Sequence, residues 1–537
     1  MGDILSLWPM PSYRPKQREV LLKIHELFEG GKRLILLEAP TGFGKSAVNT
    51  ALCRYYTPSI YTTPQLSLIN QILGDPYLGK YFVEIKGMDN YRCAKDNYLT
   101  PVRLGLCRRE KGVIPDRCRW LSECPYFSQK MRAIRSPMVL TSTAYFIVDA
   151  YLEPPNFSNR NLVVIDEGHL LSEYVADQVS LEVSAKSLPA PVWDRLKDKY
   201  RDRPPTDAEL EDVRLDLEIM LKTYQMTLDA GAALSDDEAE WRHRAERWLD
   251  KYKRYLDFYD VAEWVWTKMR FGWKAVPVYA RWFMEQMLWS RGEKFLISSA
   301  TILKPKLWIW ENGADLVFRH DEMVHIEVSY SFPPENRPII DVSVGSMSKV
   351  DQEENLEPAA KMLKYIIQKH RNENIVVHFP SYDLAEKFMS ILDGDETLDA
   401  EIFIPSPENR DAVLDEWKRK GGVFFAVAYW EGQDWKYDMC TVQVLAKTLY
   451  PDVSDPRVAR RLEKKDFQWL MWITLIKCLQ AYGRAMRAED DRMMFYVLDD
   501  KFWELLKRNW PHIPAWFKEV VPRNRWPKKY QRTEKNT

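Results

Sequence analysis

Residues 34–46 carry the side chains best suited to chemistry in this 537-residue chain. They read Leu-Ile-Leu-Leu-Glu-Ala-Pro-Thr-Gly-Phe-Gly-Lys-Ser, an apolar run followed by a glycine-rich turn. Gly42 and Gly44 permit backbone N–H groups to close around phosphate oxygens, because no Cβ stands in the way. Lys45 would reach the β- and γ-phosphates, and the Ser46 hydroxyl would ligate Mg²⁺. The run predicts a strand, a phosphate loop and a helix that bind a nucleotide, with Ala39 where glycine is usual.

An acidic pair follows a second apolar run. Residues 161–169 read Asn-Leu-Val-Val-Ile-Asp-Glu-Gly-His. Asp166 would hold Mg²⁺ through water, and Glu167 would orient and polarise the attacking water. Two carboxylates after a strand could instead cap a helix. A phosphate loop about 120 residues upstream favours the catalytic interpretation.

Two arginines late in the chain complete a hydrolytic set. Residues 480–487 read Gln-Ala-Tyr-Gly-Arg-Ala-Met-Arg. In a helix, Gln480, Arg484 and Arg487 fall at i, i+4 and i+7 and share one face. Such arginines could reach a γ-phosphate from across a cleft, with Gly483 permitting close approach. The alternative is a solvated basic face.

The run Tyr-Arg-Pro-Lys-Gln at residues 13–17 lies just upstream of the phosphate loop. Arg14 and Gln17 are candidate nucleotide contacts, and the Gln17 amide could read an adenine edge through its donor and acceptor. The alternative is the solvated start of a helix.

Four of the seven cysteines fall within one short window, at Cys93, Cys107, Cys118 and Cys124. They are separated by 13, 10 and 5 residues, with no close pair and no histidine. Structural zinc sites usually show close pairs, so this spacing favours an iron–sulfur cluster held by four thiolates. The alternative is a set of buried free cysteines. Between residues 92 and 119, eight Lys/Arg against three Asp/Glu make the window basic, which suits single-stranded nucleic acid.

The elements that must position these groups alternate between strand and helix. Strands are predicted within 59–66 and 295–301, each ending in small residues, and at 374–379 and 423–428. The sequences Thr-Asp-Ala-Glu at 206–209 and Ser-Asp-Asp-Glu at 235–238 are capping boxes that open two long helices. Aromatic residues at helical spacing in the second of them predict a packed core rather than a base-stacking platform.

Bulk composition excludes a few classes of protein. The chain is too long for one core, so three or four domains are expected. Mean hydropathy is −0.42, and no apolar run approaches the roughly 20 residues of a membrane span. Without a signal-peptide pattern at the N-terminus, a cytoplasmic or nucleoid-associated protein with no membrane partner is expected. The net charge of −1 neither supports nor excludes a polyanionic partner.

The motifs together resemble the XPD/DinG-like family of iron–sulfur superfamily 2 helicases. The resemblance rests on Ala-Pro-Thr-Gly-Phe-Gly-Lys-Ser, the four cysteines, Asp-Glu-Gly-His and Gln-x-x-Gly-Arg-x-x-Arg. Residues 431–435, Glu-Gly-Gln-Asp-Trp, are similar to the family's Glu-Gly-x-Asp-Phe and add Asp434 to the nucleotide contacts. Ser-Ala-Thr at 299–301 replaces the family's usual Ser-Gly-Thr.

The resemblance implies an α/β fold of two RecA-like motor domains. A cysteine-rich Fe–S insertion and a helical arch would interrupt the first. The expected boundaries are motor domain 1 at 1–84, 132–184 and 276–322; the Fe–S domain at 85–131; the arch at 185–275; motor domain 2 at 323–522; and a basic tail at 523–537.

The implied activity is ATP-dependent unwinding of DNA by a monomer that moves 5′ to 3′ on single strands. The cofactors would be ATP, Mg²⁺ and a [4Fe-4S] cluster, and the DNA substrates would be single-stranded and forked. Protein partners would bind through the arch. Candidate site residues, in full, are Arg14, Gln17, Thr41, Gly42, Gly44, Lys45, Ser46, Asp166, Glu167, Asp434, Gln480, Arg484 and Arg487, with the four cysteines as metal ligands. Two alternatives stay open: an ATP-driven clamp or assembly subunit that does not unwind, and an RNA-directed motor.

Overall fold

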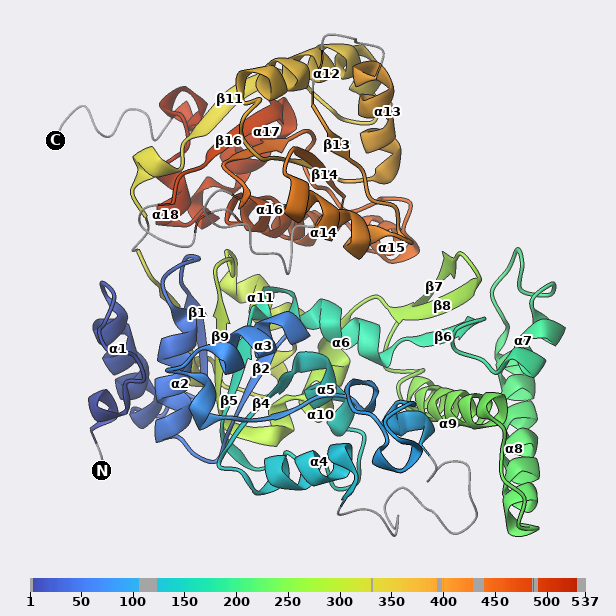
Figure 1. The fold of residues 1–537 in the computed structure, drawn as a ribbon. Helices are drawn as coiled ribbons and strands as arrows, with labels where there is room; N and C mark the ends of the chain where they lie inside the picture. Colours follow the sequence, from blue (N-terminus) through green and yellow to red (C-terminus); the bar gives the residue numbers. More distant parts are fainter. Residues whose placement is uncertain are drawn as a thin grey trace.

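The computed structural model describes residues 3–105, 123–329, 332–393, 398, 400–427, 439–484, 486 and 491–528. Two parallel sheets flanked by helices make up most of the chain, one above the other in Figure 1. A smaller antiparallel sheet with two long helices projects to one side of them. Throughout the described ranges, no helix is both long enough and apolar enough to cross a bilayer.

The first sheet has seven parallel strands in the order β10-β1-β9-β5-β2-β4-β3. Its inner strands are continuous apolar runs, because a parallel sheet covered by helices is buried on both faces. The strands are β1 (Leu34–Glu38), β2 (Ser59–Thr63), β3 (Val83–Ile85), β4 (Met138–Ser142), β5 (Arg160–Asp166), β9 (Gly292–Ser299) and β10 (Met323–Glu327). The accompanying helices are α1 (Gln17–Glu29), α2 (Lys45–Tyr55), α3 (Leu66–Gly74), α4 (Pro125–Arg135), α5 (Thr143–Asp149), α6 (Leu171–Val179), α10 (Met284–Met287) and α11 (Pro305–Glu311).

The second sheet has six parallel strands in the order β11-β16-β15-β12-β14-β13. It is built from one continuous part of the chain, unlike the first. The strands are β11 (Ile339–Gly345), β12 (Ile375–Phe379), β13 (Ile402–Phe403), β14 (Val423–Val427), β15 (Val442–Leu445) and β16 (Met494–Asp499). The helices are α12 (Gln352–Lys369), α13 (Tyr382–Leu392), α14 (Arg410–Lys420), α15 (Pro456–Glu463), α16 (Phe467–Tyr482), α17 (Asp500–Asn509) and α18 (Ala515–Lys518).

The boundary expected between residues 322 and 323 falls too early. β10 pairs in parallel with β1, residue by residue from Leu34 with Met323 to Glu38 with Glu327. This pairing completes the hydrogen bonding of β1, which would otherwise be an exposed edge strand. The chain therefore finishes the first sheet before it crosses to β11 at Ile339.

The projecting unit contains β6 (Leu181–Ser184), α7 (Ala190–Leu196), α8 (Asp207–Asp229), α9 (Asp236–Asp257), β7 (Trp264–Met269) and β8 (Gly272–Pro277). Both predicted capping boxes are fully formed, at the starts of α8 and α9. Trp248, Tyr252 and Tyr255 of α9 are buried and Trp241 is partly buried, and the Trp248 and Tyr252 rings stack with centroids 5.0 Å apart. The prediction that this stripe is core is confirmed.

The expectation that residues 185–275 are helical is wrong for the hairpin of β7 and β8. The hairpin pairs with β6, which begins before residue 185, in a three-stranded antiparallel sheet. Aromatic and β-branched residues in Trp-Val-Trp-Thr favour a strand. Gly272 has φ 130°, and a Cβ there would lie 2.2 Å from the Val183 carbonyl oxygen, so only glycine fits this turn.

The start of the expected basic tail packs against the second sheet. Arg525 forms ion pairs with Asp341 and Asp500, and its guanidinium lies 5.4 Å from the Trp503 ring centroid. Trp526 packs against Trp510. Residues 523–526 therefore belong to the folded unit, and residues 529–537 lie outside the described residues.

Candidate nucleotide site between the two sheets

Two glycines in left-handed conformations shape the turn between β1 and α2. Gly42 has φ 81° and Gly44 has φ 83°, values that side chains with a Cβ rarely adopt. A Cβ on Gly44 would also lie 2.4 Å from Nε2 of Gln17. α2 begins at Lys45, whose Nζ donates to the Ala39 carbonyl at 3.1 Å. The turn thus combines a helix N-terminus with a cation, the combination that binds phosphate.

Arg14 and Gln17 brace this loop. The Arg14 guanidinium donates to the Gly42 carbonyl. The Gln17 amide donates to the Phe43 carbonyl at 2.7 Å and accepts from the Arg14 backbone N–H at 2.7 Å. Both ends of the amide are engaged with backbone groups, and Gln17 is 2% exposed; its contact with an adenine edge stays a prediction. Here the side chain holds the loop backbone in place.

Asp166 lies at the carboxyl end of β5, where it meets α2 through a tyrosine. Its Oδ2 accepts from the Tyr61 hydroxyl at 2.8 Å, and the Ser46 hydroxyl also hydrogen-bonds to Tyr61. Burial, and then the Glu167 carboxylate, raise the pKa of Asp166, while Lys45 opposes them. A buried carboxylate beside a serine hydroxyl, both near the phosphate loop, fits the oxygen ligands that Mg²⁺ takes.

Glu167 adopts an unusual backbone conformation, with φ 50°. Burial alone would raise the pKa of its carboxyl, but nearby groups outweigh burial and lower it below the ordinary value. His169 makes the largest of these contributions, followed by Lys45 and Arg484. The carboxylate is therefore ionised, the state required of a group that orients and polarises water.

A chain of polar contacts runs from Glu167 into the half of the molecule that contains the second sheet. Nδ1 of His169 lies 3.4 Å from Glu167 Oε2 and 3.0 Å from Ser299 Oγ. Ser299 Oγ accepts from the Thr301 backbone N–H at 3.1 Å. The Gln480 amide then donates to Thr301 Oγ1 at 2.8 Å. Because Ser299 ends β9 and Gln480 lies in α16, the chain of contacts spans both halves of the molecule.

The helix that carries Gln480 is shorter than predicted. α16 ends at Tyr482, so the prediction that Arg484 shares a helical face with Gln480 is wrong. The Gly483 N–H closes the last turn on the Leu479 carbonyl at 3.0 Å, and glycine lowers the tendency to continue the helix. Arg484 follows in the turn beyond. It is 6% exposed and lies near enough to Glu167 to help lower the pKa of that carboxyl.

Gly483, just after α16, lies close to the phosphate loop. A Cβ at this position would lie 3.2 Å from Thr41 Oγ1. That distance is shorter than an ordinary van der Waals contact. A side chain larger than the hydrogen of glycine would therefore crowd the phosphate loop. The structure therefore brings Thr41, Lys45, Glu167 and Arg484 to one place between the sheets.

Some predicted site residues lie outside the described residues, namely Arg487, Asp434, Cys107 and Cys118. The other two cysteines are half-buried, and an ion pair between Lys95 and Glu123 joins their two segments. A Cβ on Gly105 would lie 2.9 Å from the Cys93 sulfur, so that thiol sits in a close-packed turn. Within the described ranges, no group of three or more His, Cys, Asp or Glu side chains is placed to hold a metal.

Sequence reasoning missed Tyr61 as a site residue. Its hydroxyl accepts from the Asn49 amide at 3.2 Å as well as donating to Asp166. The available signal was a tyrosine within the buried strand at 59–63, because a buried phenol needs hydrogen-bond partners.

Comparisons with known proteins agree with this architecture. A family model described as a helicase C-terminal domain matches residues 363–520, and the DEAD_2 model matches residues 114–188. By sequence, no curated protein matches the chain. The solved structure described as XPD_Helicase superposes with a TM-score of 0.65 at 16% identity, covering 94% of this chain and 98% of its own. Xpd4 from S. tokodaii gives 0.57 at 16% identity, with coverages of 92% and 97%. The structure described as XPD_APO gives 0.60 at 15% identity, with coverages of 93% and 98%.

The two matched family models and the shared fold lead to one assignment. They account for the parallel sheets, the order of the motifs along the chain and the convergence of those motifs between the two halves. The chain matches helicase family models over residues 114–188 and 363–520 and has the fold of the XPD helicase structures, which together support an ATP-hydrolysing helicase.

Proposed function

We propose that this protein is an ATP-driven motor that moves 5′ to 3′ on single-stranded DNA and unwinds forked duplexes. The observation that carries the proposal is the chain of contacts from Glu167 through His169, Ser299 and Thr301 to Gln480. It connects the carboxylate that would orient water with a helix of the opposite motor. A change at the γ-phosphate would thus reach the interface on which stepping depends.

Hydrolysis in this proposal uses groups from both halves. Lys45 neutralises charge on the β- and γ-phosphates, and Glu167 orients the water for in-line attack. Arg484 stabilises charge that develops on the transferred phosphoryl group. Ser46 and Asp166 would hold Mg²⁺, which would supply further neutralisation of the phosphates. Thr41 and Gly483 lie at the point where the two halves meet and would sense closure.

The cysteine segment is proposed as the strand-separating element. Cys93, Cys107, Cys118 and Cys124 would hold a [4Fe-4S] cluster, which would fix a segment otherwise poor in apolar contacts. The ion pair that brings the Cys93 and Cys124 segments together is compatible with a shared site. The projecting unit between β6 and β8 would serve as the arch and as a partner platform.

Two variants test the motor assignment. Lys45→Ala should abolish ATP hydrolysis, because Lys45 is the cation of the phosphate loop that would neutralise the β- and γ-phosphates. Glu167→Gln should still bind ATP but turn over orders of magnitude more slowly, since the water loses its orienting carboxylate. Substantial ATPase activity in either variant would refute the assignment.

A second experiment distinguishes a DNA substrate from an RNA substrate, and unwinding from a clamp that only hydrolyses ATP. Unwinding by the wild-type protein with ATP would be measured on forked DNA that carries either a 5′ or a 3′ single-stranded arm. The stimulation of its ATPase activity would be compared for single-stranded DNA and RNA of one sequence. The proposal expects unwinding from the 5′ arm and stronger stimulation by DNA. Stimulated ATPase without unwinding would favour a clamp, and stronger stimulation by RNA would favour an RNA-directed motor.

A further inference from the structure

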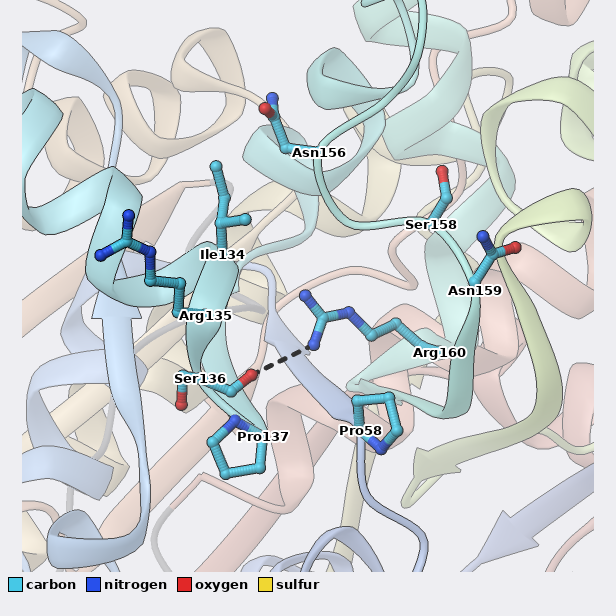
Figure 2. A pocket seen from close by; sticks show the side chains of 9 residues that line it. All are labelled: Pro58, Ile134, Arg135, Ser136, Pro137, Asn156, Ser158, Asn159 and Arg160. Carbon is cyan, nitrogen blue, oxygen red and sulfur yellow. Dashed lines mark hydrogen bonds between the residues drawn. The ribbon is translucent and has the colours of Figure 1, made fainter.

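A polar pocket of about 350 Å³ lies at the edge of the first sheet where β2, β4 and β5 begin (Figure 2). The nucleotide site lies at the opposite, carboxyl ends of these parallel strands. The pocket is lined by Pro58, Ile134, Arg135, Ser136, Pro137, Asn156, Ser158, Asn159 and Arg160. Two of these residues are cationic and none is acidic, so an anion would meet no charge repulsion from the lining.

Arg160 extends into the middle of this pocket, as Figure 2 shows. It is 4% exposed, and its Nε has no hydrogen-bond partner. Its Nη1 makes one long contact, 3.4 Å from the Ser136 carbonyl oxygen. No carboxylate of the described chain lies within ion-pair distance of it. A buried guanidinium with unused donors is costly unless an anion supplies the missing bonds.

The nearest buried carboxylate is already occupied. Asp149 accepts from Arg291 at 2.5 Å, from the Asn156 amide at 2.7 Å and from the Phe157 backbone N–H at 3.0 Å. Arg291 is 1% exposed, so the single charge of Asp149 is matched by one buried arginine. Arg160 is therefore the excess positive charge of this cluster, and it faces the pocket.

The lining suits a phosphate group attached to a small organic body. Arg160 presents a planar fork of N–H donors, and Ser158 and Asn159 add a hydroxyl and an amide to the pocket lining. Exposed Arg135 adds a second positive charge at the rim, which favours a dianion. Pro58, Ile134 and Pro137 supply apolar wall for the rest of the molecule. The volume lies at the lower end of the range for small-molecule sites, about 300–1,000 Å³.

We propose that this pocket binds a small phosphorylated molecule at a site separate from the nucleotide cleft. An occupant would bridge the end of α4 and the start of β5. Because α4 begins directly after Cys124 and β5 ends at Asp166, the two elements lead to the cysteine segment and to the acidic pair. Binding would therefore stiffen the connection between them.

The test measures binding by calorimetry in the Lys45→Ala protein, so that the phosphate loop contributes little. The probes are ribose 5-phosphate, inorganic phosphate and ribose. The site should bind ribose 5-phosphate saturably, inorganic phosphate more weakly and ribose not at all. Arg160→Gln should weaken ribose 5-phosphate binding by about tenfold or more, because charge-assisted hydrogen bonds are lost.

Two surface variants keep the test decisive if Arg160→Gln does not fold. Asn159→Asp places a negative charge at the pocket and keeps the left-handed backbone, φ 55°, that aspartate tolerates. It should weaken binding at least about fivefold. Arg135→Gln should weaken it a few-fold, whereas Arg132→Gln, an equal loss of charge in the same last turn of α4 but outside the lining, should not.

Three outcomes would overturn the proposal. The first is that neither phosphate probe binds saturably. The second is that ribose 5-phosphate binds the Lys45→Ala protein equally well with and without Asn159→Asp. The third is that Arg132→Gln and Arg135→Gln weaken binding equally. The last would mean general attraction to a basic surface. Loss of DNA unwinding in the motor assay would leave this binding measurement unaffected, so the two proposals fail separately.

Discussion

Glu311→Gln should weaken the joint between the two halves of the molecule. Glu311 lies in α11, beside the first sheet, and Arg461 lies in α15 of the second half. Both side chains are fully buried and are joined by hydrogen bonds of 2.8 and 2.7 Å. The guanidinium also lies 4.5 Å from the Tyr279 ring centroid and 4.2 Å from that of Trp469, so it has no path to water.

The expected loss in the free energy of unfolding depends on which hydrogen-bond partners Arg461 would keep. Removing one partner of a buried ion pair costs about 3–5 kcal/mol, because the other charge stays buried. Asp466 remains 3.0 Å away and is itself 19% exposed, and glutamine keeps the volume and one acceptor. We therefore expect a loss near the lower limit, about 3 kcal/mol. At about 2.1 cal/mol/K of unfolding entropy per residue, the 537-residue chain loses roughly 1 °C per kcal/mol, so the melting temperature should fall by about 3 °C.

Differential scanning calorimetry of the full chain is the assay, with Glu401→Gln as the control. Glu401 pairs with Lys420 on the surface, where the side chains are 55% and 41% exposed, so its loss should cost less than about 1 kcal/mol. We also expect Glu311→Gln to split one transition into two, since the joint couples the halves. A melting temperature within about 1 °C of wild type would refute the reasoning.

Three further outcomes are expected. In steady-state ATPase kinetics, Arg484→Ala should lower kcat by about 10³-fold or more and change KM far less, because the arginine acts on charge that develops in the transition state. An unchanged kcat with weaker ATP binding would contradict this. Cys124→Ser should lose visible cluster absorption and fork unwinding yet keep much of the basal ATPase; wild-type unwinding would exclude the segment as the wedge. Burial lowers the pKa of His378 to about 4, against the opposing effect of the hydrogen bond that its Nε2 donates to Gln443 Oε1. Its contribution to the free energy of unfolding is therefore complete above pH 6.5, and about 3 kcal/mol of it is lost as the pH falls from 6.5 to 4. Denaturant titrations over this pH range should show a smaller loss of stability for His378→Gln than for the wild type.

The strands and the phosphate loop could be read from sequence because they depend on local signals. Continuous apolar runs ending in glycine or in acids specify β1 and β5 without reference to the rest of the chain. The capping boxes of α8 and α9 are equally local, and both form. For the same reason, the groups that converge between the sheets were identified in kind, although their contacts were not.

Tertiary pairing decided the features that sequence reasoning missed. β10 looks like the start of a new domain, and only its pairing with β1 shows otherwise. α16 ends at Tyr482, before Arg484, although the spacing of Gln480 and Arg484 is helical. Gln17 illustrates the same limit, since its amide, considered from sequence only as a base contact, also holds the loop.

The position of β1 has a consequence for how the protein is made. Both of its neighbours, β9 and β10, come from a part of the chain about 250 residues later. At about 5–20 residues per second, the ribosome needs roughly 15–60 s to supply them. During that time a strand of Leu-Ile-Leu-Leu has both edges unpaired, while the longest such wait in the second sheet, between β11 and β16, is about 155 residues. We expect the nascent first half to be the point at which chaperones are needed, and the nucleotide site to be among the last features to mature.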